Sequence, residues 1–234
     1  MKNNIFLLIA ASIFILSFSS CDDLLDVTPK DKITPETFFS TEADLQAFST
    51  NFYNSLPKDR DLYKDDADNI THSTPNSAAT DSRTVPASGG GWEWGYLRRF
   101  NTLLQYSVNC KDKTVRTRYQ ALTRFFRAYF YFEMVKRFGD IPWYETELFV
   151  SETDQLNKPR DSRELVMKNI LEDLDFAITN LSTTPSVYTV TKWTALSLKS
   201  RVCLFEGTFR KYHNLNLSAN ADFFLQESIT ASRE

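Results

Sequence analysis

Residues 125–142 read FFRAYFYFEMVKRFGDIP and form the most apolar stretch of the chain after its N-terminal segment. The surrounding segment, about 114–138, runs for more than 20 residues without a glycine or a proline. Aromatic residues would also suit a strand, but a run of this length favours a helix. Because apolar side chains lie on nearly every side, we expect this helix to be buried among others. Gly139 fits its C-terminal cap, and Pro142 follows in the exit loop.

The composition of the chain also favours helices. Its 234 residues include only 6 glycines, whereas 14% are aromatic. Sandwiches and barrels built only from strands need frequent glycine-containing turns, so this composition argues against them. The long glycine-free segments also exclude the phosphate-binding loops of Rossmann and P-loop proteins. A net charge of −3 gives no support for nucleic-acid binding, which usually shows a basic excess.

Five more helices are predicted from apolar residues that recur three or four positions apart. They span about residues 41–56, 92–110, 161–181 and 191–212, and the last begins near 221. Thr41 is the expected N-cap of the first, and Asp161 with Glu164 is the expected capping pair of helix 161–181. Successive helix pairs with long loops at 57–91 and 140–160 are similar to tetratricopeptide repeats. We therefore expect an all-α fold, a tetratricopeptide-like scaffold of helical hairpins with long loops.

The last predicted helix is interrupted by the end of the chain at Glu234. Terminal repeats of a solenoid carry a polar outer face, whereas Phe224 and Leu225 would leave an apolar face exposed here. We therefore expect the chain to be a truncated part of a longer helical protein, with residues 41–234 as its incomplete N-terminal helical domain.

The first 20 residues have the features of a secretion signal. Lys2 supplies a positive charge, and residues 5–16 form an apolar stretch that is short for a membrane span. Small residues then precede Cys21, as at the processing site of bacterial lipoproteins. We expect cleavage before Cys21 and lipid attachment to its sulfur. The alternative is an ordinary signal peptide followed by a chance cysteine. Residues 21–40 are predicted to form an extended leader.

Catalytic and metal-binding motifs are missing from the sequence. It contains no G-x-S-x-G or H-E-x-x-H motif and no cysteine or histidine spacing suited to zinc. The acidic segment 59–68 lacks the glycine and final glutamate of an EF-hand loop, which favours a solvated loop over a calcium site. Cys110 and Cys203 are expected to be free and buried, with a disulfide as the alternative. We predict neither a cofactor nor a metal, and we disfavour a lipid-anchored hydrolase.

The loop that leads into the second predicted helix holds the best candidates for a binding site. Trp92 and Trp94 follow three glycines, and Asp68, Asn69 and Arg83 precede them. Indole faces can stack on the apolar faces of sugar rings, while carboxylate, amide and guanidinium groups hydrogen-bond to hydroxyl groups. These five residues are the predicted ligand-binding residues. The alternative interpretation is that both tryptophans begin the helix and pack into the core.

Several short motifs occur in the order found in one known family. They are the leader from Cys21, FFSTEAD at 38–44, Trp94-Gly95-Tyr96 with Asn101, the segment 125–142, PRDSR at 159–163, ILEDL at 170–174, and Thr191-Lys192 with LFEGT at 204–208. Together these motifs resemble the SusD/RagB family of outer-membrane lipoproteins of Bacteroidetes. The resemblance covers nearly the whole chain after residue 20.

The resemblance implies a tetratricopeptide-like scaffold that binds oligosaccharides, or peptides in the RagB branch, and is not an enzyme. Lipid on Cys21 would hold such a protein at the surface of the outer membrane. There it would serve as the lid of a SusC/RagA-type TonB-dependent transporter in polysaccharide utilisation. Family members are substantially longer, and the C-terminal half that supplies much of their ligand site is missing here. A second class stays open: a structural lipoprotein that contacts a protein partner and binds no ligand.

Overall fold

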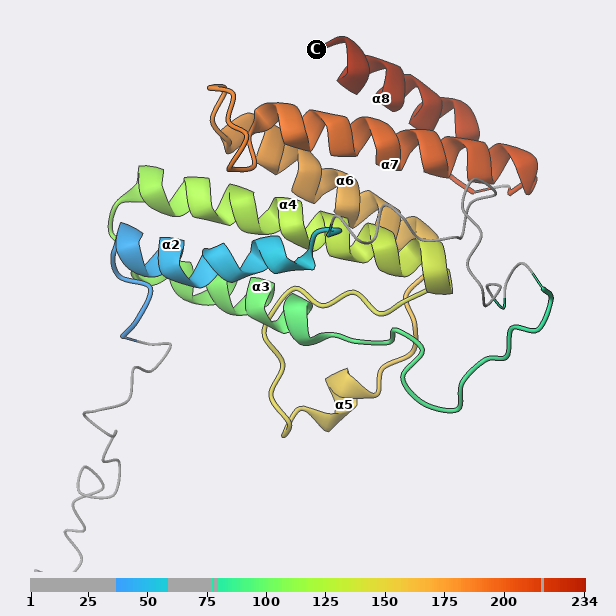
Figure 1. Cartoon of the computed structure of the whole chain (residues 1–234), viewed down its shortest axis with the longest axis horizontal. Coiled ribbons are helices and arrows are strands. Elements are labelled where there is room, and N and C mark those ends of the chain that lie inside the picture. Colours follow the sequence, from blue (N-terminus) through green and yellow to red (C-terminus); the bar gives the residue numbers. More distant parts are fainter. Residues whose placement is uncertain (1–36, 59–76, 78–79, 216) are drawn as a thin grey trace, which may run out of the picture. The chain divides into compact units, whose positions relative to one another are not determined.

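Helices make up the regular secondary structure of the described residues, which in the computed structural model are 37–58, 77, 80–215 and 217–234. Within these residues one β-bridge, between Ile141 and Asp161, occurs outside any strand. The predicted all-α fold is therefore confirmed. The elements, labelled in Figure 1, are α2 (Glu42–Thr50), η2 (Asn51–Ser55), α3 (Gly95–Tyr106), η4 (Ser107–Asn109), α4 (Lys113–Phe138), α5 (Thr153–Leu156), α6 (Arg163–Asn180), α7 (Lys192–Tyr212) and α8 (Ala221–Arg233).

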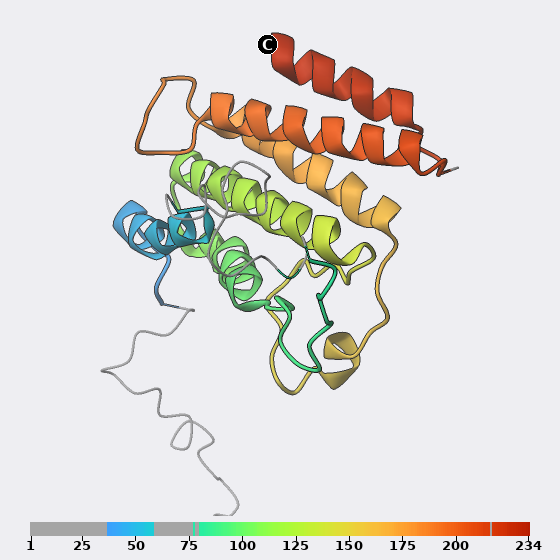
Figure 2. The same cartoon turned by 45° about the vertical axis from the view of Figure 1, so that its right-hand side comes forward.

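The helices pack as a layered stack around α4. Figures 1 and 2 show α4, α6, α7 and α8 in succession, with α2 and α3 on the opposite side of α4. Neighbours along the chain pack on one another, α3 on α4, α6 on α7 and α7 on α8. This arrangement is the one expected of a helical-hairpin scaffold. The core follows α4, where Phe126, Ala128 and Tyr131 are fully buried.

Helix α4 confirms the prediction for residues 114–138. The carboxylate of Asp112 accepts hydrogen bonds from the backbone N–H groups of Thr114 and Val115, which caps the N-terminus. Gly139 ends the helix with φ +72°, a conformation that favours glycine. Helix α2 likewise starts at the predicted cap, because the hydroxyl of Thr41 accepts from the backbone of Asp44.

Helix α3 begins three residues later than predicted, at Gly95 rather than Trp92. The three loop glycines, Gly89–Gly91, all have positive φ, so the chain turns sharply before the tryptophans. Trp94 occupies the N-cap position, and its backbone is not helical. The alternative interpretation, that both tryptophans begin the helix and pack into the core, is therefore wrong about the start of the helix, whereas both side chains do pack against the core.

Ser162 rather than Asp161 caps α6, so the predicted capping pair is also wrong. The hydroxyl of Ser162 accepts from a backbone N–H in the first turn of the helix. The carboxylate of Asp161 accepts instead from the backbone of Trp143 and from Lys158. Glu164 accepts from the loop before α8. Partners outside α6 thus bind both acidic side chains.

Helix α8 does not leave the predicted apolar face exposed. Phe224 is 2% exposed, and its ring lies under the guanidinium of Arg210, 4.4 Å from ring centroid to carbon. Leu225 is half-buried and packs close to Gly207, where an added Cβ would come within 2.8 Å of the leucine side chain. Helix α8 therefore packs closely on α7.

Cys110 and Cys203 are free and buried, as predicted. Burial raises the pKa of the Cys203 thiol to about 12. Residues 1–36, which include the predicted signal, Cys21 and most of the leader, lie outside the described residues. In the part of the chain that the structure describes, no helix is both long and apolar enough to cross a membrane.

Candidate ligand-binding site

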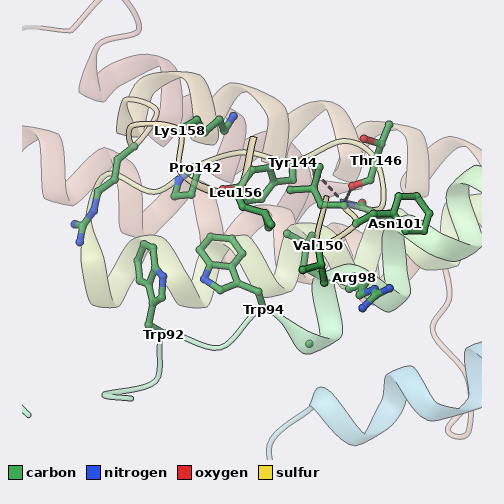
Figure 3. Close-up of a pocket in the computed structure, with 15 residues that line it drawn as sticks. Trp92, Trp94, Arg98, Asn101, Pro142, Tyr144, Thr146, Val150, Leu156 and Lys158 are labelled. Atoms are coloured by element: carbon green, nitrogen blue, oxygen red, sulfur yellow. Dashed lines mark hydrogen bonds between the residues drawn. The ribbon is translucent and has the colours of Figure 1, made fainter. Parts of the chain in front are cut away.

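A pocket of about 520 Å³ lies beside the N-terminal half of α3 and includes both predicted tryptophans. Two segments far apart in the sequence line it, residues 92–101 and residues 142–160. Figure 3 shows Trp92 and Trp94 rising from the loop before α3 toward the second segment, from which Tyr144 faces them. Aromatic and aliphatic side chains form most of the wall.

Close packing against the end of α4 holds Trp92 at the pocket. Its ring lies edge-to-face with Phe138 at 4.8 Å and with Trp94 at 5.1 Å between centroids. Gly91 has φ +84°, and a Cβ there would come within 2.9 Å of the Arg137 guanidinium. The glycine therefore permits the loop to pass this close to α4 and so positions Trp92.

Trp94 lies within the same aromatic cluster. Its ring is edge-to-face with Phe130 at 5.8 Å and with Tyr144 at 5.6 Å. Both tryptophans are half-buried. One part of each side chain packs on the core, and another part lines the pocket. The structure thus brings together the two residues proposed to meet a ligand, and it also gives both a packing role.

Asn101 positions the opposite wall of the pocket. Its side-chain amide donates to the carbonyl oxygens of Tyr144 at 3.0 Å and Thr146 at 2.9 Å, and its Oδ1 accepts from Arg127 at 3.3 Å. Arg127 in turn forms a bidentate ion pair with Asp173 of α6, with N–O distances of 2.6 and 2.8 Å. This series of contacts links α3, α4 and α6 to the loop that carries half of the pocket.

A second group of hydrogen bonds closes the same loop at its base. The carboxylate of Asp161 accepts from the Trp143 N–H at 2.7 Å and from Lys158 at 2.8 Å. The hydroxyl of Tyr131 accepts from the Tyr144 N–H at 2.7 Å, and its ring stacks on Trp143 at 4.0 Å. Partial burial opposes ionisation of Asp161, but the hydrogen bonds from Lys158 and Trp143 outweigh it and lower the pKa of this carboxyl.

Of the other three residues proposed from the sequence for this pocket, only Arg83 lies among the described residues. Arg83 is exposed and does not line it. Asp68 and Asn69 lie outside the described residues. Sequence reasoning missed Tyr144 and Lys158 as lining residues. No periodic pattern marked them, because they lie in a loop whose path is set by contacts with α3 and α4.

One family profile matches most of the chain. It is a SusD-like family described as "Starch-binding associating with outer membrane", and the match covers residues 31–203. The chain belongs to this SusD-like family. Two SusD-like proteins of Formosa agariphila are similar to it: P38 is 27% identical over 92% of the chain, and P25 is 23% identical over 84%. These matches cover 45% and 42% of the two relatives, so this SusD-like chain spans less than half of their length.

Solved structures share the fold of this SusD-like chain. A SusD-like protein from Bacteroides fragilis has a TM-score of 0.62 at 22% identity, covering 88% of this chain and 40% of that one. A SusD homologue from Bacteroides thetaiotaomicron has a TM-score of 0.61 at 18% identity, covering 85% of this chain and 41% of that one. The predicted family and the tetratricopeptide-like fold class are therefore confirmed.

Proposed function

We propose that this SusD-like chain is a glycan-binding lipoprotein held at the surface of the outer membrane by lipid on Cys21. It captures oligosaccharides and delivers them to a SusC-like TonB-dependent transporter. The observation that carries the proposal is a pocket walled by Trp92, Trp94 and Tyr144 in a chain whose family is described as starch-binding.

The chemistry of the pocket wall suits a sugar. Sugar rings present apolar C–H faces that pack against aromatic rings, and Trp and Tyr offer such faces beside polar groups. A volume of about 520 Å³ falls within the usual range of ligand pockets, roughly 300–1,000 Å³. The exposed guanidinium of Arg98 is available on the wall for sugar hydroxyl groups.

The kinds of residue that line the pocket also support binding rather than catalysis. Hydrolysis of a glycosidic bond ordinarily requires a pair of carboxyl groups on either side of that bond. Among the described residues that line the pocket, none is an aspartate or a glutamate. The pocket can therefore hold a sugar without the groups that would cleave it.

Replacement of Trp94 tests the role of the pocket. We expect Trp94→Ala to weaken glycan binding by roughly two- to twelvefold, since one aromatic contact contributes about 0.5–1.5 kcal/mol. Calorimetry with the best oligosaccharide from a glycan array measures the change, and Trp94→Phe should retain most of the affinity. Thermal unfolding separates loss of contact from loss of fold, because Trp94 also packs on the core.

Trp193→Ala is the matched control, because this half-exposed tryptophan lies on α7 and does not line the pocket. Equal losses from Trp94→Ala and Trp193→Ala, or unchanged binding in Trp94→Ala, would contradict the proposed site. A chain that binds no glycan but binds peptides or a protein partner would support the other two interpretations. Co-purification with a TonB-dependent transporter tests the proposed delivery partner.

A further inference from the structure

The pocket wall carries positive charge and, among the described residues, no negative charge. Arg98, Lys158 and Arg160 all line the pocket, whereas no aspartate or glutamate does. Aromatic stacking requires none of these charges. The partners of each cation determine which of them is available to a ligand.

Two of the three cations are paired with carboxylates behind the wall. The Nε of Arg98 lies 2.9 Å from Glu147, whose side chain is 8% exposed. The ammonium group of Lys158 donates to Asp161 at 2.8 Å and lies 4.9 Å from the centroid of the Tyr144 ring. These pairs neutralise most of the charge that Arg98 and Lys158 bring to the pocket.

Arg160 differs from both, because it forms no ion pair with any described carboxylate. Its guanidinium lies 4.9 Å from the centroid of the Trp92 ring and donates to the backbone carbonyl of Asp140 at 3.4 Å. The Asp140 carboxylate accepts instead from the backbone of Arg163 at 2.8 Å. Arg160 therefore presents a charged group beside a stacking aromatic ring, with several N–H donors that no described residue engages.

We propose that the pocket selects anionic oligosaccharides, and that Arg160 binds a carboxylate or a sulfate group on a sugar held against Trp92 and Trp94. The inference rests on the glycan-binding function proposed above. A guanidinium presents paired N–H donors that match two oxygens of an oxyanion, and such charge-assisted bonds are roughly twice as strong as neutral ones. The cation–π contact with Trp92 holds the guanidinium in place before the ligand arrives.

The experiment uses matched pairs of oligosaccharides that differ only in charge. Uronate oligosaccharides are compared with their methyl esters, and sulfated oligosaccharides with their desulfated counterparts, so the two pairs distinguish a carboxylate from a sulfate ligand. Neutral oligosaccharides complete the set. Binding to the purified protein is measured by calorimetry at low and at high salt, and each variant is checked by thermal unfolding.

We expect one anionic member to bind about tenfold more tightly than its neutral partner at low salt, and this advantage to shrink as salt screens the charge. Arg160→Gln should abolish the advantage, and it should weaken binding of the anionic member much more than binding of its neutral partner. Arg160→Lys should restore part of it, because an ammonium group keeps the charge but not the paired donors. Arg201→Gln removes an exposed arginine of α7 that does not line the pocket, and it should change neither value.

The possible failures are distinguishable. If neutral sugars bind and the charged group adds nothing, the selectivity is overturned and the glycan-binding function stands. Equal effects of Arg160→Gln and Arg201→Gln would mean that the affinity for anionic oligosaccharides depends only on the net charge of the protein. That result also overturns the role of Arg160. If no oligosaccharide of either kind binds, the proposed function fails and this inference fails with it.

Discussion

The buried side chain of Arg127 explains why an arginine lies in the middle of the aromatic run. Its guanidinium forms the bidentate pair with Asp173, donates to Asn101 and lies 5.1 Å from the centroid of the Trp143 ring. A charge in an apolar core is costly unless it is paired and hydrogen-bonded. Here each contact also reaches a different element, so one residue aligns α3, α4, α6 and the pocket loop.

We expect Arg127→Met to lower the free energy of unfolding by about 3–5 kcal/mol, because the buried Asp173 carboxylate loses its bidentate partner and keeps only the longer ion pair with Arg124 at 3.7 Å. Urea denaturation measures the change. Arg127→Met combined with Asp173→Leu should recover much of the loss, since no buried charge is then left unpaired. Lys168→Met is the control: its ion pair with Glu172 is exposed, and its removal should cost less than about 1 kcal/mol. A loss for Arg127→Met as small as for the control would contradict this account.

At the scale of elements, the loop between α4 and α6 depends on contacts at both ends. Asn101 donates to backbone carbonyl groups in its first part. Near its end, Asp161 accepts a hydrogen bond from the backbone of Trp143 and forms an isolated bridge with Ile141. The short helix α5 lies inside this loop and has no buried residue. The loop therefore relies on a few polar contacts rather than on an apolar core of its own.

The Asp161 contact predicts a dependence of stability on pH. The pKa of this carboxyl is lowered in the folded protein from its ordinary value of 3.8, so the folded state favours the charged form. The stabilisation is therefore present above about pH 3.8 and is lost as the pH falls through the lowered pKa. We expect wild type to unfold at a higher temperature than Asp161→Asn near neutral pH. The difference should shrink below pH 3.8, and a difference that grows with acidification would refute the assignment.

The contact between α7 and α8 depends on Gly207. Alanine normally stabilises a helix interior by up to about 1 kcal/mol relative to glycine. Here its Cβ would lie 2.8 Å from Leu225 and 3.1 Å from the carbonyl oxygen of Ala221, so we expect Gly207→Ala to destabilise the fold by about 1–3 kcal/mol. Hydrogen exchange should rise in residues 221–233, and Leu225→Ala should relieve part of the defect. A stabilised Gly207→Ala would show that helix propensity outweighs this packing.

At the scale of the whole molecule, the pocket and the C-terminal helices lie on different parts of the stack. The pocket forms where residues 92–101 meet residues 142–160, beside α3 and the end of α4. Helices α7 and α8 lie beyond α6, as Figure 1 shows. Changes at the contact between α7 and α8 should therefore affect stability without altering the pocket.

Anchoring at Cys21 is a prediction about the whole protein. We expect Cys21→Ser to move the protein from the membrane fraction to the soluble fraction of cells, because the thiol proposed to carry the lipid is lost. Labelling with a fatty-acid analogue followed by fractionation measures this change. Cys110→Ser is the control, since this cysteine is buried in the fold and should not be lipidated. Membrane retention of Cys21→Ser would contradict the lipoprotein assignment.

Much of the fold was predictable from local patterns in the sequence. Helix periodicity, proline positions and Gly139 predicted α4 and the order of the longer helices, because these signals act within a few residues. One wrong prediction came where two neighbouring residues could each cap the same helix. Asp161 and Ser162 are both good N-caps, and contacts with Lys158 and with the more distant Trp143 determine that Asp161 is used elsewhere.

The candidate site was likewise predictable only in part. The glycines and tryptophans of residues 89–94 indicated one wall of the pocket, because their composition is unusual in this chain. The other wall comes from residues 142–160, which reach the tryptophans only because Asn101, Arg127 and Tyr131 hold the loop there. Local sequence thus specifies helices and a stacking motif, because propensity and periodicity are short-range. The pocket, and the position of Arg160 away from every described carboxylate, follow from contacts between segments far apart in the sequence, which become neighbours only when the core has packed.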